Sequence, residues 1–325
     1  MKFAKFKFKH PLVITAGGLG LFLIGLVFLI TSPQAVQMTQ TQLVNAGNLA
    51  FEKPKFLVPE VAGAEKKVVT VVVNGGITAP KFTANAVLAQ DLETGKLLFQ
   101  KNIGQKMSPA STTKIMTALV AQDYFKSADV LTVPPEAMVG GSSMGLSSGE
   151  SISYRNVLYG MLLNSGNDAA YTIALNYPGG FSNFVAKMNE KAQALNLTST
   201  HFENPAGFDS PNHYSAASDL AQIAIQVIKD PQLARVISTK ETSVMDFSNS
   251  KTHVLKNLNK LLSEPGVIGV KTGFTQKAGE NLVGLVERNN HKILTVVLNS
   301  EDRFGETKAL MDWIYLNFTW QQTWQ

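Results

Sequence analysis

The chain has 325 residues, of which 45% are hydrophobic and 16% charged, with a formal net charge of +5 and no cysteine. The lack of cysteine excludes disulfide scaffolds, thiol catalysis and cysteine-ligated zinc or iron–sulfur sites. Lys2, Lys5, Lys7 and Lys9 supply most of the net charge and the rest of the chain is nearly neutral, so no nucleic-acid partner is expected.

The first predicted element is a transmembrane segment at residues 12–30. These 19 residues contain neither a charge nor a proline, and a helix of this length spans the roughly 30 Å hydrocarbon core of a bilayer. A cleaved signal peptide is the alternative, but Pro33 lies two residues before Ala35, which makes a poor cleavage site. We expect a cytoplasmic basic tail at 1–11, a single-pass signal-anchor at 12–30 in the cell membrane, and an extracytoplasmic remainder.

Residues 31–82 are predicted to form an extracytoplasmic tether. The stretch 31–51 contains no charge, and the rest includes three prolines and the Gly75-Gly76 pair. The exception is VVTVVV at residues 68–73. This β-branched run predicts an edge strand or, if it stays exposed, an aggregation hazard.

Residues 83–325 are predicted to form one α+β catalytic domain. A hairpin of strands is expected first, followed by several helices, three strands and a final helix. The strands are predicted at 84–89, 97–100, 266–272, 281–287 and 292–299, and the helices at 110–125, 154–163, 168–175, 181–195, 215–228 and 306–317. This order favours an antiparallel sheet flanked by terminal helices, with a mostly helical subdomain.

Two serine motifs in this domain give weak signals. Ser143 lies in a G-x-S-x-G pattern, which needs a strand before it and a helix after it. It lies instead in a Gly/Ser-rich loop after two prolines, so we do not expect a nucleophile there. The Ser-x-x-Lys segment from Ser248 to Lys251 lies in a polar stretch and predicts a hairpin turn.

A second Ser-x-x-Lys segment, Ser111 to Lys114, opens the helix predicted at 110–125. Positions i and i+3 share one face of a helix, so Lys114 is expected beside the Ser111 hydroxyl. The alternative is that Ser111 only caps the helix and Lys114 is a solvated base. This motif alone does not separate the two interpretations.

Two further motifs decide between them. Ser165-Gly166-Asn167 lies at the break between two apolar helices, and Lys271-Thr272-Gly273 lies within a predicted strand. Each is common by itself, as a second S-x-N at Ser210 to Asn212 illustrates. All three motifs in this order, each in its required structural context, indicate a serine enzyme that uses a lysine base.

From about Ala84 to Phe318 the chain resembles the penicillin-recognising serine peptidases of the D-alanyl-D-alanine carboxypeptidase family, the low-molecular-weight penicillin-binding proteins. Connecting stretches such as FENPAGFDSPNHYSAASDL and VKTGFTQKAGENLVG share the resemblance. It implies a β-lactamase-like α+β fold that needs neither a metal nor a cofactor. It also implies a peptidoglycan stem peptide ending in D-Ala-D-Ala as substrate, and β-lactam antibiotics as covalent inhibitors.

The resemblance also assigns catalytic roles. Ser111 would be the acylated nucleophile, Lys114 its general base and Ser165 a proton relay. The backbone N–H groups of Ser111 and Phe274 would form the oxyanion hole. A lysine can serve as the base if it is neutral, and burial beside a second cation such as Lys271 would depress its pKa.

The remaining assignments concern substrate binding. Asn167 would hold a substrate amide, Lys271 and Thr272 the terminal carboxylate, and Gly273 would leave room for the peptide along the strand. Arg303 aligns with a family arginine near the carboxylate pocket; the alternative is a surface ion pair at the start of the last helix. His213 is expected to hold its own loop in place.

Two other functions remain open at this point. A β-lactamase would share the acylation chemistry and need a deacylating glutamate, for which Glu203 is the available residue. A non-catalytic peptidoglycan-binding scaffold is the other alternative. The small second β-domain and the amphipathic C-terminal helix of many family members are not expected, and the balance between hydrolysis and transpeptidation stays open.

Overall fold

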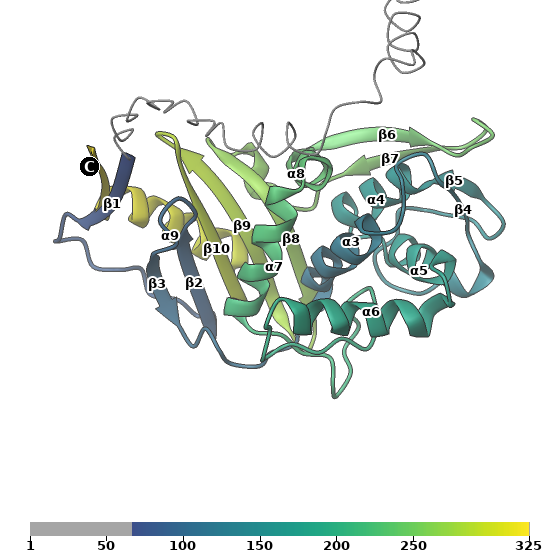
Figure 1. The fold of residues 1–325 in the computed structure, drawn as a ribbon, viewed down its shortest axis with the longest axis horizontal. Coiled ribbons are helices and arrows are strands. Elements are labelled where there is room, and N and C mark those ends of the chain that lie inside the picture. Colours follow the sequence, from purple (N-terminus) through teal and green to yellow (C-terminus); the bar gives the residue numbers. More distant parts are fainter. Residues whose placement is uncertain (1–66, 325) are drawn as a thin grey trace, which may run out of the picture. The chain divides into compact units, whose positions relative to one another are not determined.

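A five-stranded antiparallel sheet lies at the centre of residues 67–324, the part of the chain that the computed structural model describes (Figure 1). Alternate side chains of each strand point to opposite faces of the sheet. In the second strand of the order, Leu88 therefore packs into one hydrophobic cluster and Val87 into another. The strand order is β3 (Leu97–Lys101), β2 (Ala86–Asp91), β10 (His291–Ser300), β9 (Gly279–Arg288) and β8 (Val267–Thr275).

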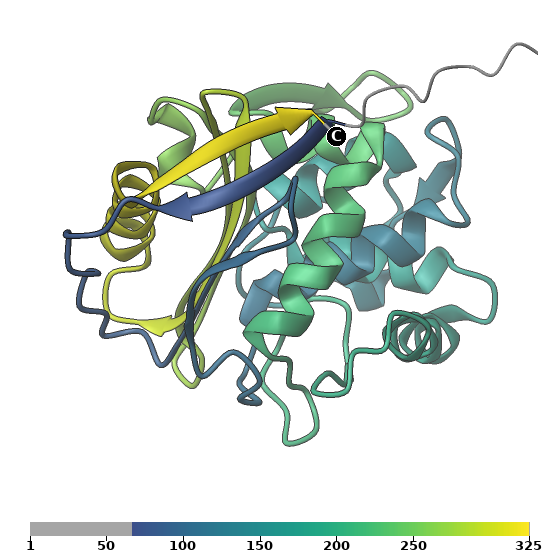
Figure 2. The same ribbon diagram turned by 60° about the vertical axis from the view of Figure 1, so that its left-hand side comes forward.

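Helices cover both faces of this sheet. Helix α9 (Arg303–Asn317) packs on β9 and β10, and its Leu310 and Ile314 join the cluster that contains Val87. On the opposite face lie α7 (Ala217–Lys229) and α8 (Pro231–Ser238), as Figure 2 shows for α7 and α9.

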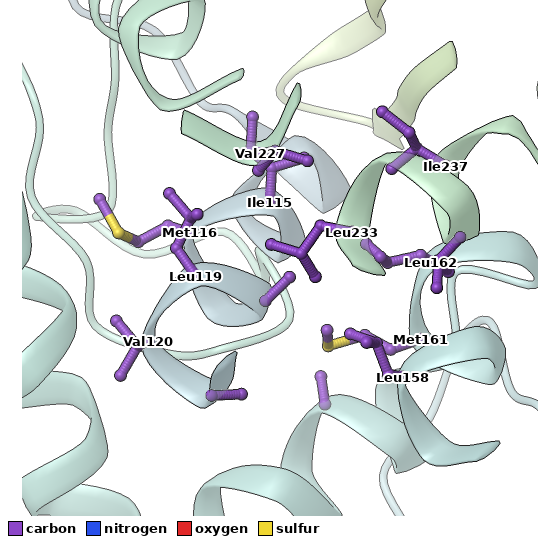
Figure 3. Close-up of a cluster of buried hydrophobic side chains, with 14 of the residues drawn as sticks. Ile115, Met116, Leu119, Val120, Leu158, Met161, Leu162, Val227, Leu233 and Ile237 are labelled. Atoms are coloured by element: carbon purple, nitrogen blue, oxygen red, sulfur yellow. The ribbon is translucent and has the colours of Figure 1, made fainter. Parts of the chain in front are cut away.

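The helical subdomain lies beside β8. Its cluster of apolar side chains comes from α3, α4, α7 and α8, including Ile115, Leu158 and Leu233, all of which are buried (Figure 3). Burial of each such side chain contributes about 1.5–3 kcal/mol. The subdomain contains η2 (Ala110–Thr113), α3 (Lys114–Gln122), β4 (Val130–Thr132), η3 (Pro135–Ala137), β5 (Ser151–Ser153), α4 (Tyr154–Leu163), α5 (Asn167–Asn176) and α6 (Gly180–Ala194).

A hairpin of β6 (Glu241–Met245) and β7 (Thr252–Lys256) follows α8, and the short helix η4 (Lys260–Ser263) leads from it to β8. The predicted hairpin turn at Ser248 to Lys251 is confirmed, because these residues connect the two strands. The strands themselves and α8 were not predicted from the sequence.

A two-stranded ribbon joins the first and last described segments. Strand β1 (Lys67–Val73) pairs antiparallel with β11 (Phe318–Trp324). Trp320 stacks on His291 with ring centroids 4.4 Å apart, and its Nε1 donates a 2.8 Å hydrogen bond to Asp91. The prediction of an edge strand at 68–73 is thus confirmed, and this end of the predicted tether 31–82 belongs to the folded unit.

The α+β fold class is confirmed, and most predicted elements lie within three residues of their observed bounds. The helix predicted at 110–125 differs, because it begins as the 3₁₀ turn η2 and ends at Gln122. The tail 1–11 and anchor 12–30 lie outside the described residues. Within residues 67–324, no helix combines the length and apolar character that crossing a membrane requires.

Candidate active site

Ser111 lies in the 3₁₀ turn that precedes α3. The preceding residue, Ala110, has a φ of 49°, a left-handed conformation that is uncommon for a residue other than glycine. In a 3₁₀ turn, side chains at i and i+3 eclipse each other. Lys114 therefore lies directly beside Ser111, with Nζ and Oγ 3.0 Å apart, as the sequence predicts.

Lys114 is fully buried and has three hydrogen-bond partners. Its Nζ donates to Asn167 Oδ1 at 2.8 Å and to the Ala206 carbonyl at 2.7 Å. These two oxygens can only accept, whereas the third partner, the Ser111 hydroxyl, can also donate. A neutral amine would use its two N–H groups on the acceptors and turn its lone pair toward Ser111.

The electrostatic surroundings favour that neutral amine. Burial lowers the pKa of Lys114 well below its usual value, and the charge of Lys271 lowers it further, against a smaller opposing effect of Asp168. Lys271 is itself 2% exposed, and burial together with the charge of Arg303 lowers its pKa to about 7. Both lysines therefore favour the neutral form far more than an exposed lysine does.

Asn167 is held in one orientation by the loop before β5. Its Nδ2 donates to the Gly140 carbonyl at 2.8 Å, and its backbone N–H donates to Ser142 O at 2.7 Å. Because Nδ2 is committed to Gly140, Oδ1 faces Lys114.

The carboxylate of Asp168 organises the same loop. It accepts hydrogen bonds from the backbone N–H groups of Met144, Gly145 and Leu146, and from the Ser143 hydroxyl at 2.6 Å. The segment around Ser143 is a loop, as predicted, and the hydroxyl is engaged in holding it.

Ser165 occupies the break between α4 and α5 with a φ of 59°, and it is 3% exposed. Within the part of the chain that the structure describes, its hydroxyl makes no hydrogen bond. The lysine of the third motif, Lys271, donates from Nζ only to the Thr272 carbonyl among the described residues, at 3.0 Å. Both groups thus retain capacity for a ligand.

Two glycines allow close approach around the Ser111 turn. A Cβ on Gly273 of β8 would lie 3.2 Å from the Ser111 backbone nitrogen, and one on Gly207 would lie 1.8 Å from Ala110 O. Gly207 also has a φ of 91°. Gly273 therefore contacts the Ser111 turn. Phe274 follows Gly273 in β8, so the backbone segments of the two predicted oxyanion-hole residues lie close together.

Arg303 begins α9 and lies against β8. Its Nη1 donates to the Gly273 carbonyl at 2.8 Å, while Nε lies 4.0 Å from Glu280 Oε2. The helix is capped by its neighbour Asp302, which accepts from the Gly305 N–H. The ion pair of the alternative interpretation is present, but the side chain, 17% exposed, lies beside the third motif rather than on the open surface.

His213 is buried behind the site. Its Nδ1 accepts from the Glu203 N–H at 3.0 Å, so Nε2 carries the proton and donates to Thr113 Oγ1 at 2.8 Å. Burial lowers the pKa of His213 to about 4, which keeps it neutral. It holds its loop against the Ser111 turn, in agreement with the sequence-based expectation.

Sequence reasoning missed Asp168, Ala206 and Gly207. Asp168 directly follows the Ser165-Gly166-Asn167 motif, and the other two lie in the FENPAGF stretch, but neither stretch shows by itself which of its groups reach the site. Ala206 contributes only its carbonyl, which no side-chain motif reveals. In residues 67–324, no three His, Asp or Glu side chains group in a way that could hold a metal ion.

Comparison with known proteins identifies this constellation. The profile of the D-alanyl-D-alanine carboxypeptidase family, Peptidase_S11, matches residues 74–302. The chain belongs to this family. The D-alanyl-D-alanine carboxypeptidase DacF of Bacillus subtilis is 33% identical over 245 residues, which are 72% of this chain and 63% of DacF. DacC of Escherichia coli, another carboxypeptidase, is 34% identical over 255 residues, 73% of this chain and 62% of DacC.

Solved structures of the family agree with the fold. The Streptomyces K15 DD-transpeptidase is 30% identical with a TM-score of 0.70, and the match covers 73% of this chain and 98% of that one. The chain spans a little under two thirds of the length of the curated carboxypeptidases DacF and DacC. The residues that the family profile matches, 74–302, contain the three motifs described above.

Proposed function

We propose that the chain is a serine-type D-alanyl-D-alanine carboxypeptidase that removes the terminal D-Ala from peptidoglycan stem peptides. The observation that carries the proposal is the buried Lys114 amine 3.0 Å from the Ser111 hydroxyl, with a strongly depressed pKa. The names of DacF and DacC support the substrate class.

In this mechanism the neutral Lys114 amine takes the proton of the Ser111 hydroxyl as Oγ attacks the carbonyl carbon of the penultimate D-Ala. The negative charge that develops on the carbonyl oxygen is stabilised by the N–H groups of Ser111 and Phe274. The peptide C–N bond then breaks, and the departing D-Ala nitrogen takes a proton relayed by Ser165. Water hydrolyses the resulting ester and regenerates the Ser111 hydroxyl.

Substrate binding uses the groups along β8. The terminal carboxylate would lie against Lys271, Thr272 and Arg303, where cationic charge is concentrated. The second N–H of Asn167 Nδ2, which is not used on Gly140, and the open edge at Gly273 would hold the peptide backbone. A β-lactam would be attacked by Ser111 in the same way and remain as an ester.

A β-lactamase activity receives less support from the geometry. The Glu203 carboxylate accepts hydrogen bonds from Ser210 and Asn212 of its own loop. A carboxylate engaged in this way is poorly placed to activate a water for rapid deacylation. We therefore expect a long-lived penicillin ester.

Acylation by a fluorescent penicillin tests the nucleophile. Ser111→Ala should abolish labelling and D-Ala release, whereas Ser143→Ala should keep both, because only the Ser111 hydroxyl can form the ester. A Ser111→Ala protein that still releases D-Ala would sink the assignment. Rapid loss of label from the wild type would indicate a lactamase, and no label at all a scaffold.

Product analysis with a pentapeptide ending in D-Ala-D-Ala, with and without an added amine acceptor, separates hydrolysis from transpeptidation. The tetrapeptide should be the main product. A cross-linked product as the main species would instead favour the activity named for the K15 structure.

The proposed location is the outer face of the cell membrane, with residues 12–30 as a retained single-pass anchor and 31–66 as part of a tether. The support is the apolar run and the poor cleavage site. Mass spectrometry of the membrane-extracted protein should find an intact N-terminus. A chain that begins near Val36 would show that the segment is a cleaved signal peptide.

A further inference from the structure

A basic cavity outside the active site lies between the base of the β6–β7 hairpin and η4. Its volume is about 410 Å³, within the usual range for small-molecule sites. Three lysines and one glutamate line it, which gives its wall a net positive charge. The lining residues are Lys240, Glu241, Lys256, Asn257, Asn259, Lys260, Leu262 and Ser263.

The lysines of this cavity form no ion pair with Glu241 or with any other carboxylate among the described residues. Among the described residues, the ammonium groups of Lys240 and Lys256 form neither an ion pair nor a hydrogen bond, although Lys256 lies directly across the hairpin from Glu241. The third lysine, Lys260, lies with Nζ 5.7 Å from the ring of Phe304. Three lysine side chains, each a cationic hydrogen-bond donor, thus line the same cavity.

A buried amide adds a further, unsatisfied donor. Asn259 is 3% exposed, and its Oδ1 accepts from the Leu261 N–H at 3.1 Å, which fixes the orientation of the amide. The Nδ2 atom on the other side is buried and has no hydrogen-bond partner in the described structure. Asn259 lines the cavity, and a buried donor without a partner costs about 1–3 kcal/mol, so a ligand acceptor that reaches Nδ2 would relieve this cost.

From these observations we propose that the cavity binds a phosphate group carried on a polyol or sugar unit. Lysine ammonium groups act as point charges that can meet the tetrahedral oxygens of a phosphate from several directions. The cavity contains no arginine, and its volume exceeds that of a lone ion. The proposal does not depend on the proposed peptidase function.

The cavity is connected to the active site through two contacts. The Lys256 N–H donates to Asn164 Oδ1 at 2.8 Å, and Asn164 directly precedes Ser165. Lys260 and Arg303 both lie against the ring of Phe304. A phosphorylated ligand in the cavity would therefore be held beside the Ser165 and Arg303 side of the site.

Titration calorimetry of the full-length protein in detergent with glycerol 3-phosphate tests this proposal. Asn259→Asp keeps an oxygen for the Leu261 N–H but replaces the free donor with a negative charge, and should weaken binding roughly tenfold. Lys256→Gln should weaken it about threefold. The matched control is Lys81→Gln, which removes the same charge outside the cavity and should bind like the wild type.

Two further ligands define the specificity. Glutarate, which carries carboxylates only, should bind at least roughly tenfold more weakly than glycerol 3-phosphate, and inorganic phosphate should lie between them. If the wild type and all three variants bound glycerol 3-phosphate equally, or if none bound it at millimolar concentrations, the proposed site would be overturned. Glutarate binding as tight as that of glycerol 3-phosphate would overturn the choice of phosphate, and equal binding of inorganic phosphate would overturn the polyol or sugar part. The melting temperature of each variant confirms that it is folded.

Discussion

The two Ser-x-x-Lys segments of this chain have the same spacing but very different surroundings. Lys114 is fully buried, contacts Ser111 and has a strongly depressed pKa. The Lys251 side chain is 38% exposed, and it bonds the Gly145 carbonyl, Ser147 and Glu150 rather than Ser248. Ser248 in turn bonds Asp246 and Ser250.

The difference shows what the motif needs in order to become reactive. A helical turn brings positions i and i+3 together, whereas the bend between β6 and β7 points the two side chains to different partners. Burial then removes the water that would stabilise an ammonium ion. Spacing alone supplies neither condition.

Replacing the lysine of each segment by arginine tests this comparison most strongly. Arginine cannot deprotonate in the accessible pH range, so Lys114→Arg should reduce the rate of penicillin acylation by about 10²–10⁴-fold. Lys251→Arg keeps the charge and the donors and should acylate at close to the wild-type rate. Stopped-flow labelling measures both, and similar rates for the two variants would remove Lys114 from its role as base.

The pH dependence of acylation should reflect the buried lysine pair. The reactive form of Lys114 is the neutral one, and the pKa of Lys271 lies at about 7. The rate should therefore rise with pH, with apparent pKa values that belong to the coupled pair rather than to one residue. Lys271→Arg keeps a cation at all accessible pH values, so this variant should lose the titration of the second lysine and bind substrate less well. A flat profile from about pH 5 up to about 10, the ordinary lysine pKa, would contradict the lysine mechanism.

Much of this site can be predicted from side chains alone. Ser111, Lys114, Ser165, Asn167 and Lys271 each come from a motif whose secondary structure can be read from hydrophobic periodicity. The sheet strands are equally accessible, because they are long apolar runs.

The groups that tune the site are harder to predict. The Ala206 carbonyl, which accepts from Lys114, lies 92 residues further along the chain, and a backbone acceptor carries no sequence signal. Strand β11 was missed because its pairing with β1 joins the two ends of the described chain, and such long-range pairs leave no local pattern. Asp168 organises the 143–146 loop through backbone N–H groups, which only the folded structure brings together.

A smaller effect on acylation is expected from a substitution at Gly273, where β8 passes the turn that carries Ser111. An alanine Cβ would lie 3.0 Å from the Pro109 carbonyl and 3.2 Å from Ser111 N. The turn must then shift, so Gly273→Ala should destabilise the protein by about 1–3 kcal/mol and slow acylation about tenfold or more, because small misplacements of a nucleophile are costly. Gly104→Ala is the control, since its Cβ meets nothing within 4 Å. Denaturant unfolding and labelling rates of the two variants should differ clearly.

Removing Lys251, the lysine of the second Ser-x-x-Lys segment, should affect the stability of the protein more than its acylation rate. Lys251→Met would take three hydrogen bonds from the loop that reaches Asn167, while Glu150 keeps its 2.5 Å contact with His253. We expect a loss of roughly 1–2 kcal/mol in unfolding free energy and an acylation rate within about tenfold of the wild type. A loss of acylation as complete as that of Lys114→Arg would show that the hairpin segment acts directly in the chemistry.

The smallest effect is predicted for Ser248→Ala, the counterpart of the nucleophile replacement. The Ser248 hydroxyl is the largest contributor to the lowered pKa of Asp246, which lies at about 2. Asp246 still accepts from the N–H groups of Ser250 and Lys251, at 2.8 and 2.9 Å, so the turn should keep its form. The melting temperature should fall by at most roughly 2 °C at neutral pH.

A lowered carboxyl pKa stabilises the folded state above the unfolded pKa, and this contribution is lost as the pH falls through the folded value. The small difference between variant and wild type should therefore shrink as the pH falls toward about 2 and vanish below it, while the acylation rate stays unchanged throughout the active range.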